Sequence, residues 1–325
     1  MGSITQLLKT FNSFALFTHI SPDGDALGSC NALKLALKSM GKKAYIYCDG
    51  KVPNNFDFMK VTLEKNEKHI EKVDVCLMLD CNNLGRIGKY AEMFDKAKIK
   101  ACIDHHQPEK ENNLVFNSSF VDSASPSTSD LVMEIIKTLG VDITKDIAVN
   151  LYAGLASDTG CFQHSTTTPL SHLHACELME KEFDLEEINY KLFKYKPKRY
   201  LEFYQTALKS TKSYLSGKLF VAFVNHKTYK KYYEICENSA AFHFLDGIDG
   251  NEVRAKVIEK EPGVFHMSLR SNLYANVCNI ARALGGGGHV KASGATVSGK
   301  YKDVLNKIIE ETEKELKSNE VKRKK

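Results

Sequence analysis

Short apolar runs alternate with stretches of helical periodicity in the first half of the chain. The runs are rich in strand-forming residues and read FALFTH (14–19), AYIYC (44–48), DVCLMLD (74–80) and KACID (100–104). Strands that are apolar throughout and separated by helices are typical of a parallel sheet with helices on both faces. The pattern therefore predicts an α/β fold whose first domain, residues 1–190, is built on a mainly parallel sheet covered by helices.

The composition changes after this half. Residues 191–213 are rich in Lys, Tyr and Glu with helical spacing, which predicts a helical connector. Beyond it, KLFVAFVN (218–225) and NEVRAKVIEKEPGVFHMSLRS (251–271) have the pattern of strands, and the second segment turns at its EPG. A further helix, a strand after GGGGH and a last helix then complete a smaller α/β domain with a mixed sheet, residues 214–325.

Composition and charge narrow the class of protein. The 325-residue chain is 43% hydrophobic and carries 45 basic against 40 acidic residues, a formal charge of +5. This balance tolerates anionic partners but is too slight to predict a long nucleic acid as a partner. The nine cysteines form no CxxC pair, as expected of reduced thiols. Because the apolar runs are also too short to cross a bilayer, we expect a cytoplasmic protein without a membrane anchor.

Three of the predicted strands of the first domain end in residues that can bind metals. His19 follows the first run, Asp80 ends the third, and Asp104 ends the fourth and is followed at once by His105 and His106. In open parallel sheets the ligand crevice lies beyond the carboxyl ends of the strands, so these residues are expected to form one site. Imidazole and carboxylate together suit divalent transition metals, and favour Mn²⁺ or Mg²⁺ over a thiolate zinc site.

Two more stretches carry carboxylates toward the same predicted site. The turn SPDGD supplies Asp23 and Asp25. It is not an EF-hand loop, because the twelfth position counted from Asp23 is Lys34, where a bidentate Glu belongs. A helix starting near residue 26 would allow Asp25 to be a simple N-cap. Asp158, in LASDTG, falls at a predicted helix end, where an aspartate is unfavourable unless a cation lies beside it.

A run of four glycines lies in the second predicted domain. The glycine run at 285–288 lacks the GK[ST] ending of a Walker A loop, but its backbone amides are able to approach an anion closely, and His289 adds a proton donor.

His172 and His174 lie two residues apart on a predicted helix, so their rings point about 200° apart and cannot chelate one ion. We expect these two histidines to be surface or packing residues.

Taken in order, four of these stretches resemble the motifs of a known family. THISPDGDALGS, DVCLMLD, CIDHHQ and LASDTG are similar to the four motifs of the DHH phosphoesterase superfamily. GGGGHVKASG (285–294) resembles the signature of the DHHA1 domain that accompanies one branch of it. The whole pattern, from about Leu7 to about Leu316, is similar to the bifunctional oligoribonucleases and pAp phosphatases of the nanoRNase type. The first domain would then be a DHH domain and the second a substrate-binding DHHA1 domain.

The resemblance implies two metal ions. One would be held by His19 and Asp23, with Asp80 as the bridge. The other would be held by Asp25, Asp80, His105 and Asp158. Mn²⁺ is the ion that we expect, with Mg²⁺ and Co²⁺ as alternatives.

The resemblance also implies catalytic and substrate-binding roles. His106 would face the substrate phosphate, and Asp104 would accept a proton from a ligand imidazole and fix its tautomer. Asp80 would complete the catalytic group. The residues that correspond to substrate contacts of the family are Arg86, Arg270, Ser271, Gly286, Gly287, Gly288 and His289.

The implied activity is hydrolysis of short oligoribonucleotides to mononucleotides and of adenosine 3′,5′-bisphosphate (pAp) to AMP, by a hydroxide that bridges two metals. The chain would thus be an exoribonuclease on short RNA and a 3′(2′),5′-bisphosphate nucleotidase. A phosphodiesterase acting on cyclic di-AMP or pApA is the alternative within the same family. An inorganic pyrophosphatase would carry a different C-terminal domain, and a non-catalytic binder would have lost a ligand. The sequence leaves homodimer formation open.

Overall fold

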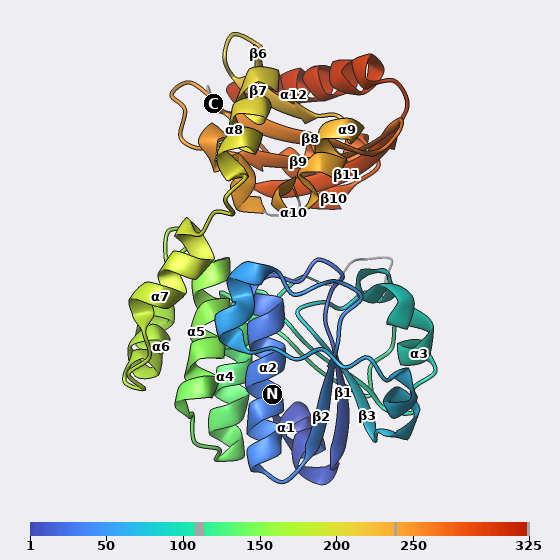
Figure 1. Ribbon diagram of the computed structural model, residues 1–325, viewed down its shortest axis with the longest axis vertical. Helices are drawn as coiled ribbons and strands as arrows, with labels where there is room; N and C mark the ends of the chain where they lie inside the picture. Colours follow the sequence, from blue (N-terminus) through green and yellow to red (C-terminus); the bar gives the residue numbers. More distant parts are fainter. Residues whose placement is uncertain (108–113, 237–238, 324–325) are drawn as a thin grey trace. The chain divides into compact units, whose positions relative to one another are not determined.

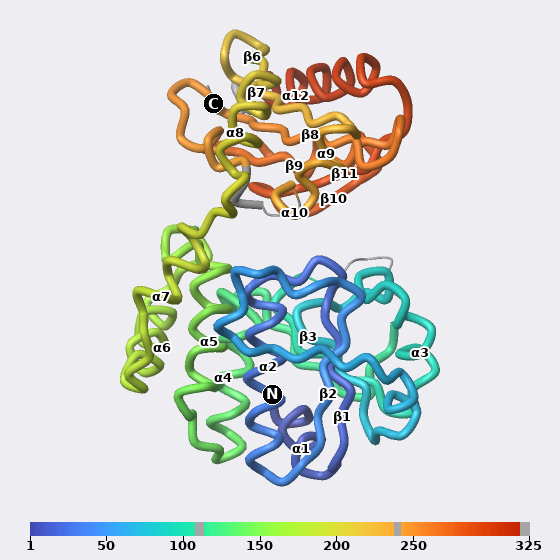
Figure 2. The backbone as a smooth tube through the Cα atoms, viewed as in Figure 1, coloured from blue at the N-terminus to red at the C-terminus, as the bar shows by residue number. Residues whose placement is uncertain are grey.

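The computed structural model describes residues 1–107, 114–236 and 239–323, and the chain forms two compact units, Met1–Tyr195 and Lys196–Lys325 (Figures 1 and 2). Each unit has a sheet of its own. All nine cysteines are free thiols. Within the described ranges, no helix is both long enough and apolar enough to cross a membrane.

The first unit is built on a five-stranded sheet in the order β2-β1-β3-β4-β5. Every neighbouring pair in it is parallel, which confirms the predicted α/β fold. The order reverses at β1, so the carboxyl ends of β1 and β3 flank the point where open sheets of this kind bind ligands. The strands are β1 (Ser13–Phe17), β2 (Lys43–Tyr47), β3 (Val75–Leu79), β4 (Lys100–Asp104) and β5 (Ser118–Val121).

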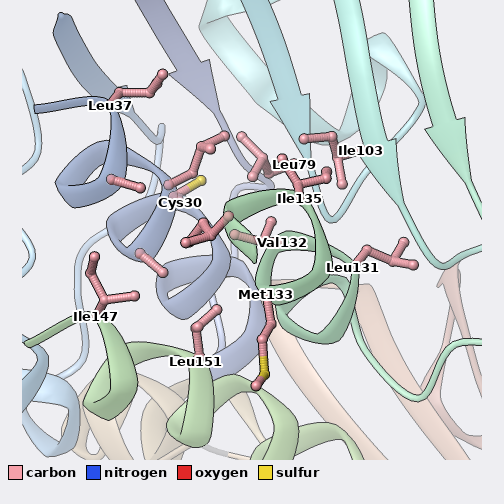
Figure 3. Close-up of a cluster of buried hydrophobic side chains, with 14 of the residues drawn as sticks. Cys30, Leu37, Leu79, Ile103, Leu131, Val132, Met133, Ile135, Ile147 and Leu151 are labelled. Atoms are coloured by element: carbon pink, nitrogen blue, oxygen red, sulfur yellow. The ribbon is translucent and has the colours of Figure 1, made fainter. Parts of the chain in front are cut away.

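Helices cover both faces of this sheet, and the strand side chains divide accordingly. Phe14 and Leu16 of β1 belong to a core shared with α2, α4 and α5. Figure 3 shows side chains of this core from the three helices, among them Cys30, Val132 and Leu151. Ala15 and Phe17 point into a second core, where Phe17 contacts Phe94 of α3. The helices of this unit are α1 (Gly2–Thr10), α2 (Gly24–Ser39), α3 (Ala91–Asp95), α4 (Thr128–Leu139), α5 (Lys145–Asp158), α6 (Pro169–Met179) and α7 (Leu185–Asn189), with the 3₁₀ helices η1 (Asn54–Met59), η2 (Glu67–Lys72) and η3 (Leu84–Tyr90) and the π-helix η4 (Tyr190–Lys194).

Two helical glycines allow α2, α4 and α5 to approach one another closely. A Cβ on Gly28 of α2 would lie 2.4 Å from the Asn150 carbonyl oxygen of α5. A Cβ on Gly154 of α5 would lie 1.9 Å from Ser129 Oγ of α4 and 2.8 Å from Asp25 Oδ1 of α2. Glycine inside a helix costs backbone entropy, so its presence at these crossings has a packing reason. The close approach brings the acidic ends of α2 and α5 to the same edge of the sheet.

The second unit contains a six-stranded mixed sheet in the order β10-β11-β9-β8-β7-β6. β7 and β8 are parallel and the other pairs are antiparallel, as the mixed sheet of the sequence prediction required. Gly263, with a φ of 75°, provides the left-handed residue of the β8–β9 turn. The strands are β6 (Lys212–Tyr214), β7 (Leu219–Val224), β8 (Val253–Glu261), β9 (Val264–Ser271), β10 (Gly287–Gly288) and β11 (Ala292–Ser298).

Two apolar clusters bury the faces of this second sheet. One joins the strands to α11 and α12, and the other joins them to α8, α9, α10 and η5. Phe203 of α8 is fully buried in the second cluster against Phe242 and Tyr232. The segment 191–213, predicted as a connector, therefore divides at residue 195, and α8 packs into the second unit. The helices are α8 (Tyr200–Ser210), α9 (His226–Lys231), α10 (Tyr233–Cys236), η5 (Ser239–Leu245), α11 (Val277–Ala283) and α12 (Tyr301–Arg323).

Candidate metal centre

Imidazoles and carboxylates gather at the carboxyl edge of the first unit's sheet. Asp80 follows β3 directly, His19 follows β1, and His105 and His106 follow β4. Three groups of these side chains and their neighbours place their ligand atoms within 4.8 Å of one another: Asp80, His105 and His106; His19, Asp23 and Asp80; and Asp25, His105 and Asp158. The groups share Asp80 and His105, so together they form one cluster.

Asp80 lies at the centre of the cluster and is only 2% exposed. Its Oδ2 is 3.3 Å from His19 Nε2, and its Oδ1 is 3.6 Å from His105 Nε2 and accepts a 3.0 Å hydrogen bond from Thr128 Oγ1. The backbone at Asp80 has a φ of 59°, a left-handed conformation that few residue types other than glycine tolerate, aspartate among them. This turn at the strand end directs the carboxylate across the edge of the sheet.

Asp23 forms the N-cap of α2. Its Oδ1 accepts hydrogen bonds from the backbone N–H groups of Asp25 (3.1 Å) and Ala26 (3.0 Å), and its Oδ2 lies 3.8 Å from His19 Nε2. The sequence had offered Asp25 for this cap. That interpretation is wrong, because α2 begins at Gly24 and the side chain of Asp25 points into the protein.

Asp25 is fully buried and held by the first turn of α4. Its Oδ2 accepts from Thr128 N at 2.6 Å, and its Oδ1 accepts from Ser129 N at 2.8 Å. Free N–H groups at a helix N-terminus stabilise a carboxylate. The pKa of Asp25 is nevertheless raised, because burial removes the carboxylate from water. The sequence analysis did not identify these α4 donors, although the Ser-rich segment before an apolar helix is the signal of a helix start.

His105 and Asp158 form the other side of the cluster. His105 Nε2 is 3.0 Å from Asp158 Oδ2 but is not aligned for a hydrogen bond, and Nδ1 lies 3.4 Å from the Ser125 carbonyl oxygen. Burial opposes the charged form of His105, yet the carboxylates of Asp158 and Asp25 outweigh it and raise the pKa to about 9. Burial, with the charge of Asp25, raises the pKa of Asp158 to about 7. With Asp25, the two side chains place their ligand atoms within 4.8 Å of one another, close enough to share a cation.

The charges of the cluster also fit cations. Burial raises the pKa of Asp80 well above its ordinary value, and the neighbouring carboxylates of Asp25, Asp23 and Asp158 add to the shift. Burial lowers the pKa of His19 to about 4, so this imidazole is neutral and able to offer a lone pair. Carboxylate oxygens and neutral imidazoles are the donor set of divalent ions such as Mn²⁺, Mg²⁺ and Co²⁺. The residues present therefore fit divalent cations.

Asp104 is fully buried and orients one imidazole. Its Oδ1 accepts from His106 Nδ1 at 2.8 Å and from His106 N at 3.0 Å, and its Oδ2 accepts from Asn82 Nδ2 at 2.7 Å. The sequence expectation was that Asp104 would serve a ligand imidazole. In the structure it holds His106, the imidazole that was expected to face the substrate. Asn82, which helps to hold Asp104, was not identified from the sequence.

The residues expected to bind substrate lie in both units. Arg86 belongs to the first unit, in η3, where it is exposed. Arg270 and Ser271 end β9 in the second unit; Ser271 Oγ donates to the buried carboxylate of Glu252 at 3.0 Å. Arg270 pairs directly across the sheet with Arg254, a second cation that the sequence analysis did not single out.

The glycine run has a packing reason that is visible in the structure. A Cβ on Gly286 would lie 2.1 Å from the Gly294 carbonyl oxygen, and one on Gly288 would lie 2.7 Å from the Ala292 carbonyl oxygen. Gly287, by contrast, has open space where its Cβ would be. His289 is exposed at the end of the run. Close pairing of β10 with β11 therefore accounts for Gly286 and Gly288, and leaves Gly287 and His289 on an accessible surface.

Comparison with known proteins gives relatives along nearly the whole chain. Residues 13–155 match the DHH family, N-terminal domain. The bifunctional oligoribonuclease and PAP phosphatase NrnA of Thermus thermophilus is 31% identical over 96% of this chain and 94% of its own length. The protein of the same name from Mycoplasma genitalium is 28% identical, with 95% and 98% covered.

Solved structures agree with this assignment. An exopolyphosphatase-related protein from Bacteroides fragilis superposes with a TM-score of 0.84 at 25% identity, covering 96% of this chain and 95% of that one. RecJ of Thermus thermophilus in complex with Mn²⁺ shares the fold, with a TM-score of 0.55 at 12% identity. The match covers 96% of this chain and 54% of that protein. These matches confirm the resemblance that the sequence motifs indicated. The chain belongs to the DHH family of phosphoesterases.

Proposed function

We propose that the protein hydrolyses short oligoribonucleotides to mononucleotides and removes the 3′ phosphate of pAp. The observation that carries this proposal is the cluster of imidazoles and carboxylates around Asp80, in a chain whose relatives are named for these two activities. Both activities are the same reaction, attack of water on a phosphate ester. One metal-assisted site is therefore sufficient for both substrates.

We assign the cluster as a centre for two divalent cations. His19, Asp23 and Asp80 would hold one, and Asp25, Asp80, His105 and Asp158 would hold the other. Four carboxylates would then balance the four positive charges of the cations. Mn²⁺ suits this mixture of oxygen and nitrogen ligands, with Mg²⁺ and Co²⁺ as alternatives. The cations would supply Lewis-acid chemistry, lowering the pKa of water toward neutrality and stabilising charge on phosphate.

His106 is the residue that we place against the reacting phosphate. Asp104 accepts from its Nδ1, and the His106 side chain is 28% exposed, so a substrate can reach it. In its protonated form, an imidazole held in this way has a second N–H that can donate to a phosphate oxygen. Arg86, exposed in η3 of the same unit, provides a positive charge for a second phosphate oxygen.

The second unit would bind the nucleotide. Arg270 provides a guanidinium for a phosphate, while Gly287 and His289 lie on an accessible surface where backbone and imidazole N–H groups can meet an anion. The Ser271 hydroxyl donates a hydrogen bond to Glu252, so we propose that it fixes the end of β9 and thereby Arg270. Gly286 and Gly288 would act through the backbone shape of the run.

The test is product analysis with defined substrates. The Mn²⁺-loaded protein is incubated with pAp, a linear RNA dinucleotide, a trinucleotide and cyclic di-AMP, and products are separated by chromatography. D80A removes the central ligand, and D146A, which changes an exposed aspartate of the same unit, is the matched control. We expect the wild type and D146A to consume pAp and the linear oligomers, and D80A to be inactive. Preferential consumption of cyclic di-AMP, or equal rates for D80A and wild type, would contradict the proposal.

A further inference from the structure

A buried ion pair joins α6 to α4, and neither of its residues is a proposed metal ligand. His174 of α6 and Asp130 of α4 have side chains that are 5% and 6% exposed, and His174 Nδ1 lies 2.5 Å from Asp130 Oδ1. The hydrogen bond to Asp130 raises the pKa of His174, so the contact is charge-assisted. Buried ion pairs contribute little net stability, because desolvation offsets their attraction. Stability alone therefore does not account for this pair.

The pair connects to His105 through Ser125. Ser125 Oγ lies 3.2 Å from Asp130 Oδ2 and 3.0 Å from the Ser127 carbonyl oxygen, and shares its one proton between these two acceptors of the same segment. The Ser125 carbonyl oxygen lies 3.4 Å from His105 Nδ1. In its neutral form, which is the form that binds metals, a histidine whose Nδ1–H faces a carbonyl carries its lone pair on Nε2. That nitrogen is the one directed at Asp158 and Asp80. The ion pair thus connects to the imidazole of the centre through the hydroxyl and the carbonyl group of Ser125.

The same short segment reaches two more members of the cluster. Ser127 Oγ accepts from Asp130 N at 3.1 Å and caps α4. The next residue, Thr128, donates its N–H to Asp25 and its hydroxyl to Asp80. Residues 125–130 therefore contact three proposed ligands, and Asp130 anchors the segment through both its backbone and its side chain.

We propose that His174 is a positioning residue of the metal centre: by binding Asp130, it fixes segment 125–130, which orients His105, Asp25 and Asp80. This inference rests on the metal centre of the proposed function. It assigns a role to a histidine for which the sequence predicted only packing or surface exposure. Groups that orient metal ligands from behind typically change metal affinity or activity by about 10–100-fold when they are altered.

Two substitutions of His174 separate positioning from bulk stability. H174N places an amide nitrogen near the position of Nδ1 and retains a donor toward Asp130. H174Q places its amide nitrogen near the position of the wild-type Nε2, which lies 3.1 Å from Glu134 Oε1. This variant therefore has no donor toward Asp130. Asparagine is the poorer helix former of the two, so an effect on helix stability alone would make H174N the worse variant. E134Q, which leaves the contact between His174 and Asp130 in place, is the matched control.

The measurement is titration of each metal-free full-length protein with Mn²⁺, following free Mn²⁺ by electron paramagnetic resonance, with circular dichroism as a check of folding. We expect H174Q to bind Mn²⁺ at least about tenfold more weakly than wild type, and H174N and E134Q to remain near wild type. Wild-type affinity in folded H174Q, or weaker binding by H174N than by H174Q, would overturn the inference. Absence of Mn²⁺ binding by wild type would instead contradict the metal centre itself.

S125A keeps the inference testable if H174Q does not fold. It removes the hydroxyl that links Asp130 to the segment and leaves the ion pair intact. We expect S125A to weaken Mn²⁺ binding in the same direction. Unchanged affinity in S125A would refute the path through Ser125.

Discussion

Replacing Asp80 by asparagine should stabilise the metal-free protein while removing its activity. The substitution keeps the shape of the side chain and removes its charge. Asn Oδ1 can still accept from Thr128 Oγ1, and Asn Nδ2 can donate to the neutral Nε2 of His19, which lies 3.3 Å from the atom it replaces. Asparagine also tolerates the left-handed backbone at this position, where φ is 59°.

The magnitude follows from the electrostatics of the cluster. Burial and four neighbouring carboxylates raise the pKa of Asp80 well above its ordinary value, and each unit of such a shift corresponds to about 1.4 kcal/mol. Removing a buried functional charge of this kind gives a gain in the free energy of unfolding of about 1–2 kcal/mol. For a unit of this size, that gain raises Tm by about 2–8 °C.

The sign of the pH dependence can be worked out from the same shift. Because the folded-state pKa of Asp80 is raised, its ionisation destabilises the fold; the cost is absent below the ordinary carboxyl pKa and grows until the pH passes the raised value. The advantage of D80N in Tm should therefore be larger at pH 8 than at pH 5. Mn²⁺ should reverse the order, since a ligand at 100 times its Kd stabilises wild type by about 2.7 kcal/mol.

The assay is thermal unfolding followed by circular dichroism, in EDTA and in Mn²⁺, at both pH values. D104N is the control, because Asp104 is a buried carboxylate that accepts three hydrogen bonds, and replacing one of its oxygens with an N–H donor should lower Tm. A metal-free D80N that melts at or below the wild-type temperature would refute the reasoning. So would a gain for D80N from Mn²⁺ equal to that of wild type.

Two further predictions concern single contacts. T128V removes the hydroxyl that donates to Asp80 Oδ1 at 3.0 Å and preserves the volume of the side chain. We expect Mn²⁺ affinity, measured by isothermal titration calorimetry, to fall about 10–100-fold. An unchanged Kd would contradict the role of this contact. R270Q removes the guanidinium at the end of β9. We expect kcat/KM for pAp to fall about 10–100-fold, which corresponds to the loss of a charged hydrogen bond. R282Q, at an exposed position of α11, should stay near wild type in steady-state kinetics.

The sequence predicted the fold of the first unit because strand periodicity and strand ends are local properties. Apolar runs identified β1, β3 and β4, and the rule that parallel strands share a carboxyl edge was enough to expect His19, Asp80 and His105 together. The helical spacing of 191–213 likewise predicted α8. It did not show that Phe203 packs into the second unit, because helical periodicity does not identify the surface against which an apolar face packs.

What the sequence could not predict depends on contacts between distant segments. Thr128 is 48 residues from Asp80, and His174 is 44 residues from Asp130. Neither contact affects the hydrophobic periodicity of the segments that contain these residues. The N-cap of α2 was misassigned by two residues, which is the ordinary precision of a helix start without its hydrogen bonds. The partner of Asp104 was decided by side-chain geometry, since His105 and His106 are adjacent and chemically identical.

The most direct test of the central claim is the initial rate of cleavage of a linear RNA dinucleotide in Mn²⁺ by wild type and D80N. The account predicts turnover by wild type and its loss in D80N, although the variant is folded and more stable than wild type without metal. Turnover by folded D80N at the wild-type rate would contradict a metal centre built around Asp80.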